Sequence, residues 1–190
     1  MSSAVATPVA TRTTWAIDPV HSSVEFAVRH LMITTVKGRF TDVQGTVVTD
    51  DLNPADGSVE VTIGAASIDT RDAQRDAHLR SADFFDADVH QSLIFRSTAL
   101  RNISPSGFKL AGDLTIHGVT RPVVLDVASE GRGRDPWGGD RAGFSATGRI
   151  KRSEFGLVWN QVLETGGLAV SDDIKIAIDV QLIKKAQQAL

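Results

Sequence analysis

The chain has 190 residues, of which 42% are hydrophobic and 23% charged, and its formal net charge at pH 7 is −3. This length and balance are ordinary for one globular domain, and the small negative charge gives no electrostatic reason to expect nucleic acid as a partner. The chain has no cysteine, which excludes disulfides, thiol nucleophiles and thiolate metal sites.

The first 13 residues, MSSAVATPVATRT, are small and polar, with neither a basic start nor an apolar run of signal-peptide length. Further along, no stretch of sequence approaches the ~20 apolar residues that span a bilayer. We therefore expect a disordered leader over 1–13, a single domain over 14–185 and a short tail over 186–190. The same features predict a soluble protein of the cytoplasm.

Alternation of apolar and polar residues with period two dominates the domain and predicts half-buried β-strands. Clusters of Gly, Pro, Asn and Asp separate the alternating stretches, as in DDLNPADG at 50–57. The strands expected from this pattern cover residues 14–18, 24–29, 36–49, 59–63, 93–100, 108–116, 123–128, 144–150 and 174–183.

The last of these strands is long, with Ile174, Ile176 and Ile178 on one face and Lys175 and Asp179 on the other. About eight to ten antiparallel strands of this kind predict an all-β fold. A sandwich and a closed barrel both fit, and long strands with one apolar face favour the barrel because closure removes exposed edges. The pattern leaves open whether side chains or a ligand fill the interior.

Residues 69–86 (DTRDAQRDAHLRSADFFD) break the alternation and carry eight Asp or Arg residues. We expect a short helix near 71–81, with Thr70 as its N-cap and a supporting i,i+4 pair between Asp76 and Arg80.

This helix has two interpretations. In the first it is a solvated cap over a barrel mouth, with Phe84 and Phe85 plugging the core. In the second, Arg75 and His78 also meet the headgroup of a ligand.

Eight stretches carry a resemblance to a known family: WAIDPVHS (15–22), FAVRHLM (26–32), KGRF (37–40), SIDTR (67–71), RDAHLRSADFFD (75–86), GDLTIHGVTRP (112–122), RSEFG (152–156) and VSDDIKI (170–176). In that order, and over about residues 14–183, they resemble the YceI-like polyisoprenoid-binding family. The resemblance implies a lipocalin-like antiparallel β-barrel of about eight strands around an apolar tunnel.

The function that the resemblance implies is non-enzymatic binding or transport of a long isoprenoid lipid, either an isoprenoid quinone or a polyprenyl phosphate. It implies no cofactor besides this ligand. Many similar proteins have signal peptides, whereas the start of this chain does not predict one.

A prenyl chain has only apolar surface, so its site needs length and an apolar lining rather than a reactive group. A phosphate headgroup needs several cations, and a quinone needs one or two donors. The candidates for the headgroup are Arg29, His30, Arg75 and His78. The candidates for the tail lining are Val24, Phe26, Val28, Phe40, Val61, Ile63, Phe84, Phe85, Phe95, Leu114, Ile116, Phe144, Ile176 and Ile178.

The five histidines permit a second hypothesis, a metal-dependent barrel enzyme. His30, His78 and His117 are candidates for a converging cluster that suits Zn or Ni, whereas His90 lies in a turn-like stretch and is assigned no role. No His-x-x-x-His pair and no Gly-x-Ser-x-Gly motif occurs, so binding is preferred to catalysis.

Two further interactions are left open. Trp137, in the turn-like stretch GRGRDPWGG at 131–139, either belongs to an ordinary exposed turn, which is the preferred interpretation, or makes transient membrane or partner contact. Similar proteins form homodimers, although no apolar stripe of this sequence is left over to require one.

Overall fold

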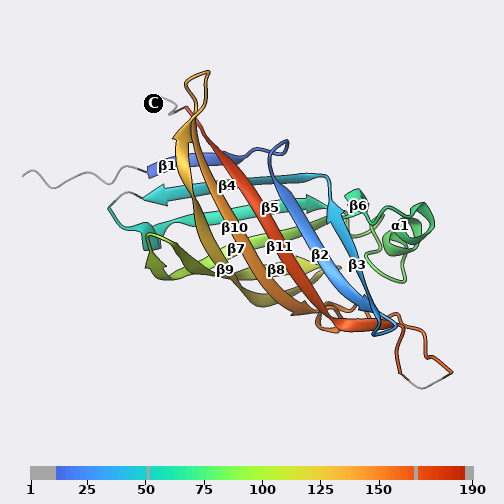
Figure 1. The fold of residues 1–190 in the computed structure, drawn as a ribbon. Helices are drawn as coiled ribbons and strands as arrows, with labels where there is room; N and C mark the ends of the chain where they lie inside the picture. Colours follow the sequence, from blue (N-terminus) through green and yellow to red (C-terminus); the bar gives the residue numbers. More distant parts are fainter. Residues whose placement is uncertain (1–11, 51, 165–166, 187–190) are drawn as a thin grey trace, which may run out of the picture.

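The computed structural model describes residues 12–50, 52–164 and 167–186. Strands make up most of the described chain, with one α-helix and three short 3-10 helices (Figure 1). In chain order the elements are β1 (Arg12–Ile17), β2 (Ser23–His30), β3 (Thr34–Phe40), β4 (Val43–Asp50), η1 (Pro54–Asp56), β5 (Ser58–Gly64), η2 (Ala65–Ser67), β6 (Ile68–Asp69), α1 (Ala73–Arg80), β7 (Ser92–Ser104), β8 (Gly107–Ile116), β9 (Val119–Arg134), β10 (Asp140–Lys151), η3 (Arg152–Phe155) and β11 (Val170–Lys184).

The strands form one closed antiparallel barrel, which confirms the predicted fold class. Hydrogen-bonded neighbours follow the order β1-β4-β5-β7-β8-β9-β10-β11, and β11 pairs again with β1, so that eight strands complete the ring. The remaining strands β2, β3 and β6 extend three of these eight: β1 continues as β2, β3 leads into β4, and β5 leads into β6.

The expected strand over 36–49 is thus two strands, β3 and β4, separated by Thr41 and Asp42. Both of these residues accept or donate backbone hydrogen bonds outside the regular ladder, with Thr41 N bonded to the Ser67 carbonyl and the Asp42 carbonyl to Gly64 N. The chain turns a corner here, and the inward positions change from even numbers in β3, such as Gly38 and Phe40, to odd numbers in β4, such as Val43 and Gly45.

The hydrophobic stripe of β11 lies as expected. Ile176 and Ile178 are half-buried, whereas Lys175 and Asp179 are exposed on the outer face. This strand pairs along one side with β10 and along the other with β2 and then β1, so it spans the full length of the barrel (Figure 1).

Helix α1 lies beyond one end of the barrel, next to β3 and β6 (Figure 1). It covers 73–80, inside the expected span, but its N-cap is Asp72 and not Thr70, because the Asp72 side chain accepts the Arg75 N–H at 3.0 Å. Thr70 is buried, and its N–H and hydroxyl donate to the carboxylate of Asp76, which is buried in the first turn. Thr70 and Asp72 are both common N-cap residue types and lie two positions apart, so the sequence alone does not separate them.

The predicted leader and tail fall largely outside the described residues. Strand β1 begins at Arg12, two residues before the expected start of the domain. The β9–β10 turn is shorter than the predicted 131–139 because residues 131–134 belong to β9. In the part of the chain that the structure describes, no helix has the length and apolar character needed to cross a membrane.

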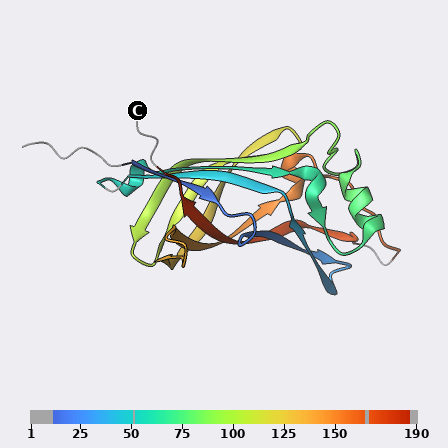
Figure 2. The same cartoon turned by 90° about the horizontal axis from the view of Figure 1, so that it is seen from above.

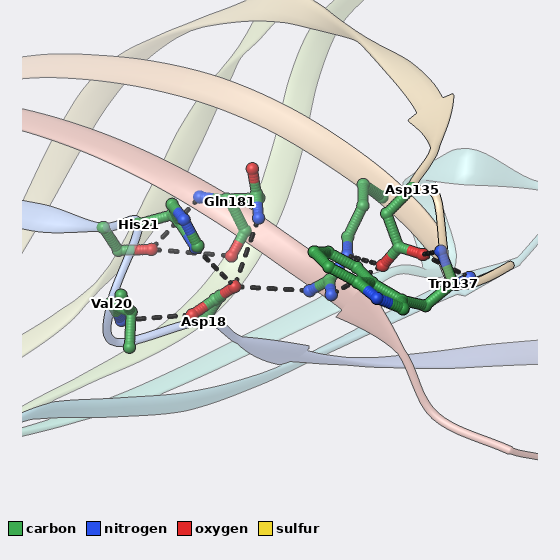
Figure 3. Close-up of polar contacts among 9 residues, drawn as sticks. Asp18, Val20, His21, Asp135, Trp137 and Gln181 are labelled. Carbon is green, nitrogen blue, oxygen red and sulfur yellow. Dashed lines mark hydrogen bonds and ion pairs between the residues drawn. The ribbon is translucent and has the colours of Figure 1, made fainter.

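The carboxylate of Asp18 joins four parts of the chain where β1 gives way to β2 (Figure 3). Asp18 is only 6% exposed and accepts hydrogen bonds from the Val20 N–H and from side chains of β10, β11 and the β1–β2 turn. These donors are His21 Nδ1 at 2.9 Å, Gln181 Nε2 at 3.1 Å and Arg141 Nη1 at 3.2 Å.

Arg141 extends this network to the β9–β10 turn. Its Nε donates at 2.8 Å to Asp135, whose carboxylate also accepts the N–H groups of Trp137 and Gly139 (Figure 3). Burial by itself raises the pKa of Asp18, but the hydrogen bonds from His21 and the Val20 backbone outweigh this effect, so the pKa lies below its ordinary value.

Replacing Asp18 by Asn should lower the free energy of unfolding at pH 7 by about 2 kcal/mol. The amide NH₂ group of asparagine takes the place of one carboxylate oxygen, and the donors that bonded to this oxygen lose their acceptor. The folded-state pKa of Asp18 is depressed, so its stabilisation is present above the unfolded-state value near 3.9 and is lost as the pH falls through the lower folded-state pKa. Urea unfolding between pH 7 and pH 2 measures both effects.

The matched control is Asp179→Asn on the exposed face of β11. The Asp18→Asn curve should fall less steeply with acid than those of the wild type and the control. Parallel curves for all three proteins would contradict the role assigned to Asp18.

Candidate functional site

Two adjoining cavities occupy the interior of the barrel, with volumes of about 470 Å³ and 210 Å³. Five apolar residues line both cavities and mark the waist where they meet: Ile17, Val61, Leu125, Ile178 and Val180. The larger cavity extends toward η1 and the β7–β8 turn, and the smaller one toward α1. In Figure 2 these two ends of the barrel lie on opposite sides.

The smaller cavity is lined by apolar side chains except for Glu25 and Arg152. Thirteen of the fourteen residues expected to line a lipid tail lie around it: Val24, Phe26, Val28, Phe40, Val61, Ile63, Phe84, Phe85, Phe95, Leu114, Ile116, Ile176 and Ile178. The fourteenth, Phe144, lines the larger cavity. Contact of these residues with a ligand stays a prediction.

Aromatic side chains close the α1 end of the smaller cavity. The ring of Phe85 packs edge-on against Phe40 at 5.8 Å, and Phe40 lies 5.9 Å from Phe26. Leu79 of α1 completes this end of the lining. Edge-to-face contacts of this kind hold rings in fixed orientations, so the helix and the residues after it form an apolar stopper.

The larger cavity combines an apolar wall with a polar rim. Its apolar part includes Phe108 and Phe144, whose rings pack at 6.2 Å. Hydroxyl groups and charges come from residues near its outer end: Thr49, Asp50, Ser58, Ser104, Ser129, Arg132 and Ser145. Arg132 is the one cationic residue among the described residues that line this cavity, and its guanidinium lies 5.8 Å over the ring of Trp15.

The four headgroup candidates do not line either cavity and are not brought together. Arg29 is exposed on the outer face of β2, where it donates to the Thr35 hydroxyl and the Met32 carbonyl. His30 lies at the end of the same strand, next to the β2–β3 turn.

The two candidates on α1 are occupied by protein partners. Arg75 donates to both the hydroxyl and the carbonyl of Thr70 at 2.8 Å. His78 bonds to Asp83 at 2.9 Å, and its ring packs edge-on against Phe84 and Trp159. A role in headgroup binding stays a prediction for all four residues, and the geometry of these two favours the structural interpretation of the helix.

The sequence did not predict Arg152 as a site residue, although Arg152 begins RSEFG (152–156), one of the eight stretches that carry the family resemblance. It is 6% exposed and borders the smaller cavity, yet it is satisfied by backbone carbonyls of the segment that leads into β11. Its Nη1 donates at 2.7 Å to the carbonyls of both Leu157 and Trp159, and its Nε donates at 3.0 Å to that of Ser171. Burial lowers the pKa of this guanidinium, and the nearby Asp172 opposes that effect.

The histidine cluster expected from the sequence is wrong. Among the described residues His30, His78 and His117 form no group, since His30 ends β2, His78 lies on α1 and His117 lies in the β8–β9 turn. The partner of His117 is His90, with ring centroids 4.7 Å apart, which is the histidine that was assigned no role. Neither of these two lines a cavity.

The fold and its interior define a class of protein: a closed eight-stranded β-barrel whose apolar cavities are capped at one end and polar at the other. Residues 15–182 match the model of the YceI-like domain. The chain is 44% identical over 137 residues to the protein YceI of Escherichia coli, covering 72% of this chain and 71% of that one. This protein therefore belongs to the YceI-like family.

Solved structures agree with this assignment. The crystal structure of BcnA from Burkholderia cenocepacia is similar with a TM-score of 0.75 and 25% identity, over 87% of this chain and 98% of that one. A polyisoprenoid-binding domain from Saccharophagus degradans has the same fold, with a TM-score of 0.65 and 12% identity, over 90% of this chain and 98% of that one.

Replacing Arg152 by Lys should loosen the segment that leads into β11 and lower the free energy of unfolding by about 2 kcal/mol, since a lysine ammonium cannot reproduce the fork of donors. Hydrogen exchange should rise in residues 157–164 before it rises in the barrel strands. Arg149→Lys, at an exposed position of β10, serves as the control. Equal exchange in both variants would contradict the bracing role of Arg152.

Proposed function

We propose that this protein is a non-enzymatic carrier that holds the isoprenoid chain of a lipid in the two cavities of its barrel. The observation that carries this proposal is the apolar lining of the two cavities, five residues of which border both. Family membership and the polyisoprenoid-binding domain of the same fold support the choice of ligand. A carrier needs no reactive group, which fits the apolar character of the lining.

Affinity can come from the tail alone. At ~0.8 kcal/mol for each buried CH₂ group, one five-carbon unit contributes up to about 4 kcal/mol. Three such units exceed the roughly 8 kcal/mol of a micromolar complex before the costs of ordering are subtracted. Polar contacts are then needed to orient the lipid and to select its headgroup rather than to bind it.

The two ends of the barrel suggest an orientation. The α1 end is closed by aromatic rings, whereas the opposite end offers Arg132 and several hydroxyl groups. We place the far end of the tail against Phe85 and the headgroup near Arg132. One guanidinium and neighbouring hydroxyls match the few donors that a quinone needs, and they provide a first anchor for a phosphate.

A larger side chain at the waist should shorten the usable tail site. Val61 lines both cavities, so in Val61→Phe the added ring obstructs the passage between them. We expect affinity for an octaprenyl lipid to fall at least about tenfold, the equivalent of two buried CH₂ groups, while a farnesyl lipid is held as before. Native mass spectrometry and titration calorimetry with lipids of both lengths measure this.

The matched control is Thr62→Phe, because threonine and valine have the same shape and Thr62 faces outward on the same strand. The control should bind both lipids as the wild type does. If the wild type bound neither lipid, or if both variants bound the long lipid equally well, the carrier proposal would fail.

Replacing Arg132 by Ala tests the orientation. Affinity for a prenyl phosphate should fall about tenfold through the loss of a charge-assisted hydrogen bond, while affinity for an isoprenoid quinone should change less than threefold. Arg75→Ala is the comparison, since it removes a cation at the closed end. A loss of phosphate binding in Arg75→Ala alone would reverse the orientation proposed for the lipid.

A further inference from the structure

Three side chains with metal-binding atoms meet just outside the closed end of the barrel. They are Asp86, which follows the aromatic pair after α1, His90, which precedes β7, and His117, in the β8–β9 turn. One carboxylate oxygen and one nitrogen from each imidazole all lie within 4.8 Å of one another, and the three residues are half-buried. Among the described residues this is the one group of three or more such side chains.

The backbone around these residues allows the two rings to approach. Gly118, at a φ of 72°, lies beneath the ring of His90, and a Cβ atom there would be 2.9 Å from His90 Cε1. His117 itself has a φ of 51° and Asp86 has a φ of 45°, both in the left-handed region. A side chain at position 118 would push His90 away from His117, so the glycine is required for the pair to form.

The three side chains are not engaged elsewhere in the described structure. None of them takes part in a side-chain hydrogen bond, and the carboxylate of Asp86 makes no ion pair within 4.0 Å of either imidazole. By contrast, His21 and His78 each bond to an aspartate at 2.9 Å. Half-buried imidazoles beside a carboxylate, all with free lone pairs, have the composition of a transition-metal site.

We propose that Asp86, His90 and His117 bind a divalent transition-metal ion such as Zn²⁺, with water in the fourth position. Two imidazole nitrogens and one carboxylate oxygen are a normal ligand set for Zn²⁺ at about 2.0–2.2 Å, whereas Mg²⁺ and Ca²⁺ prefer oxygen ligands. Tetrahedral ligands at that distance lie roughly 3.3 Å from one another. The three side chains must therefore close in by up to about 1.5 Å on binding, which side-chain rotations achieve.

The role of the ion is structural. The three ligands come from the α1–β7 connection and the β8–β9 turn, so one ion would cross-link them. Phe85 and Ile116, which directly precede Asp86 and His117, both line the smaller cavity. A bound ion would thus fasten the closed end of the barrel from outside. This site does not depend on the proposed lipid ligand.

The test uses the whole protein after treatment with a chelator, titrated with Zn²⁺ by calorimetry and followed by thermal unfolding. The wild type should bind one Zn²⁺ and unfold at a higher temperature when the ion is present, because the ion binds only the folded state. His90→Gln and Asp86→Asn should each weaken binding at least about tenfold. His30→Gln, which changes a histidine outside the group, should bind as the wild type does.

Co²⁺ gives a second readout that does not depend on stability, since its visible absorption reports tetrahedral nitrogen and oxygen coordination. His117→Asn, which tolerates the left-handed backbone, should abolish that spectrum while circular dichroism shows the barrel intact. The proposal is overturned if the wild type shows no saturable binding up to about 100 μM Zn²⁺, or if His30→Gln loses binding that His90→Gln keeps.

Discussion

Closure of the barrel depends on one edge of β11, which two different strands share. The part of β11 from Val170 to Asp179 pairs with β2, and the part from Leu182 to Lys184 pairs with β1. Between β1 and β2 the chain turns, and in this turn the buried carboxylate of Asp18 accepts four hydrogen bonds. The backbone of β11 stays paired at this point, because the Asp18 N–H donates to the Gln181 carbonyl at 2.8 Å and the Gln181 N–H donates to the Ser22 hydroxyl at 3.1 Å. The ion pair between Asp18 and Arg141 ties β10 to the same junction.

A closed ring with this many aromatic side chains does not by itself leave an open interior. Two glycines explain how space is kept: a Cβ atom at Gly38 would lie 2.4 Å from the ring of Phe26, and one at Gly112 would lie 2.4 Å from the ring of Phe95. The far edge of each phenylalanine ring thus lies over the bare backbone of a glycine in the neighbouring strand. A side chain at either glycine would therefore displace the ring that lies over it.

The sequence predicted the wall of the barrel well and its ends poorly. Alternate residues of a strand face the same side, so once Val24 faces inward, Phe26 and Val28 must do so too. The inward residues of a strand can therefore be identified without knowing which strand lies beside it. The ends are built from loops, whose contacts depend on how distant segments meet. Nothing near His90 in the sequence shows that it lies against His117, and the alternation of β9 does not show that Arg132 reaches a cavity rim.

Helix α1 is a second example of this limit, because the sequence shows its charged residues but not the groups that they contact. Arg75 and Arg80 both donate to backbone carbonyls before and around β6, so they anchor the helix to the barrel instead of facing a ligand. Arg152 does the same for the segment that leads into β11. Buried carbonyls at an irregular barrel end need donors, and arginine supplies several from one side chain. Arg75 and Arg80 thus anchor the closed end through backbone carbonyls, and the headgroup position that we propose near Arg132 lies at the opposite end.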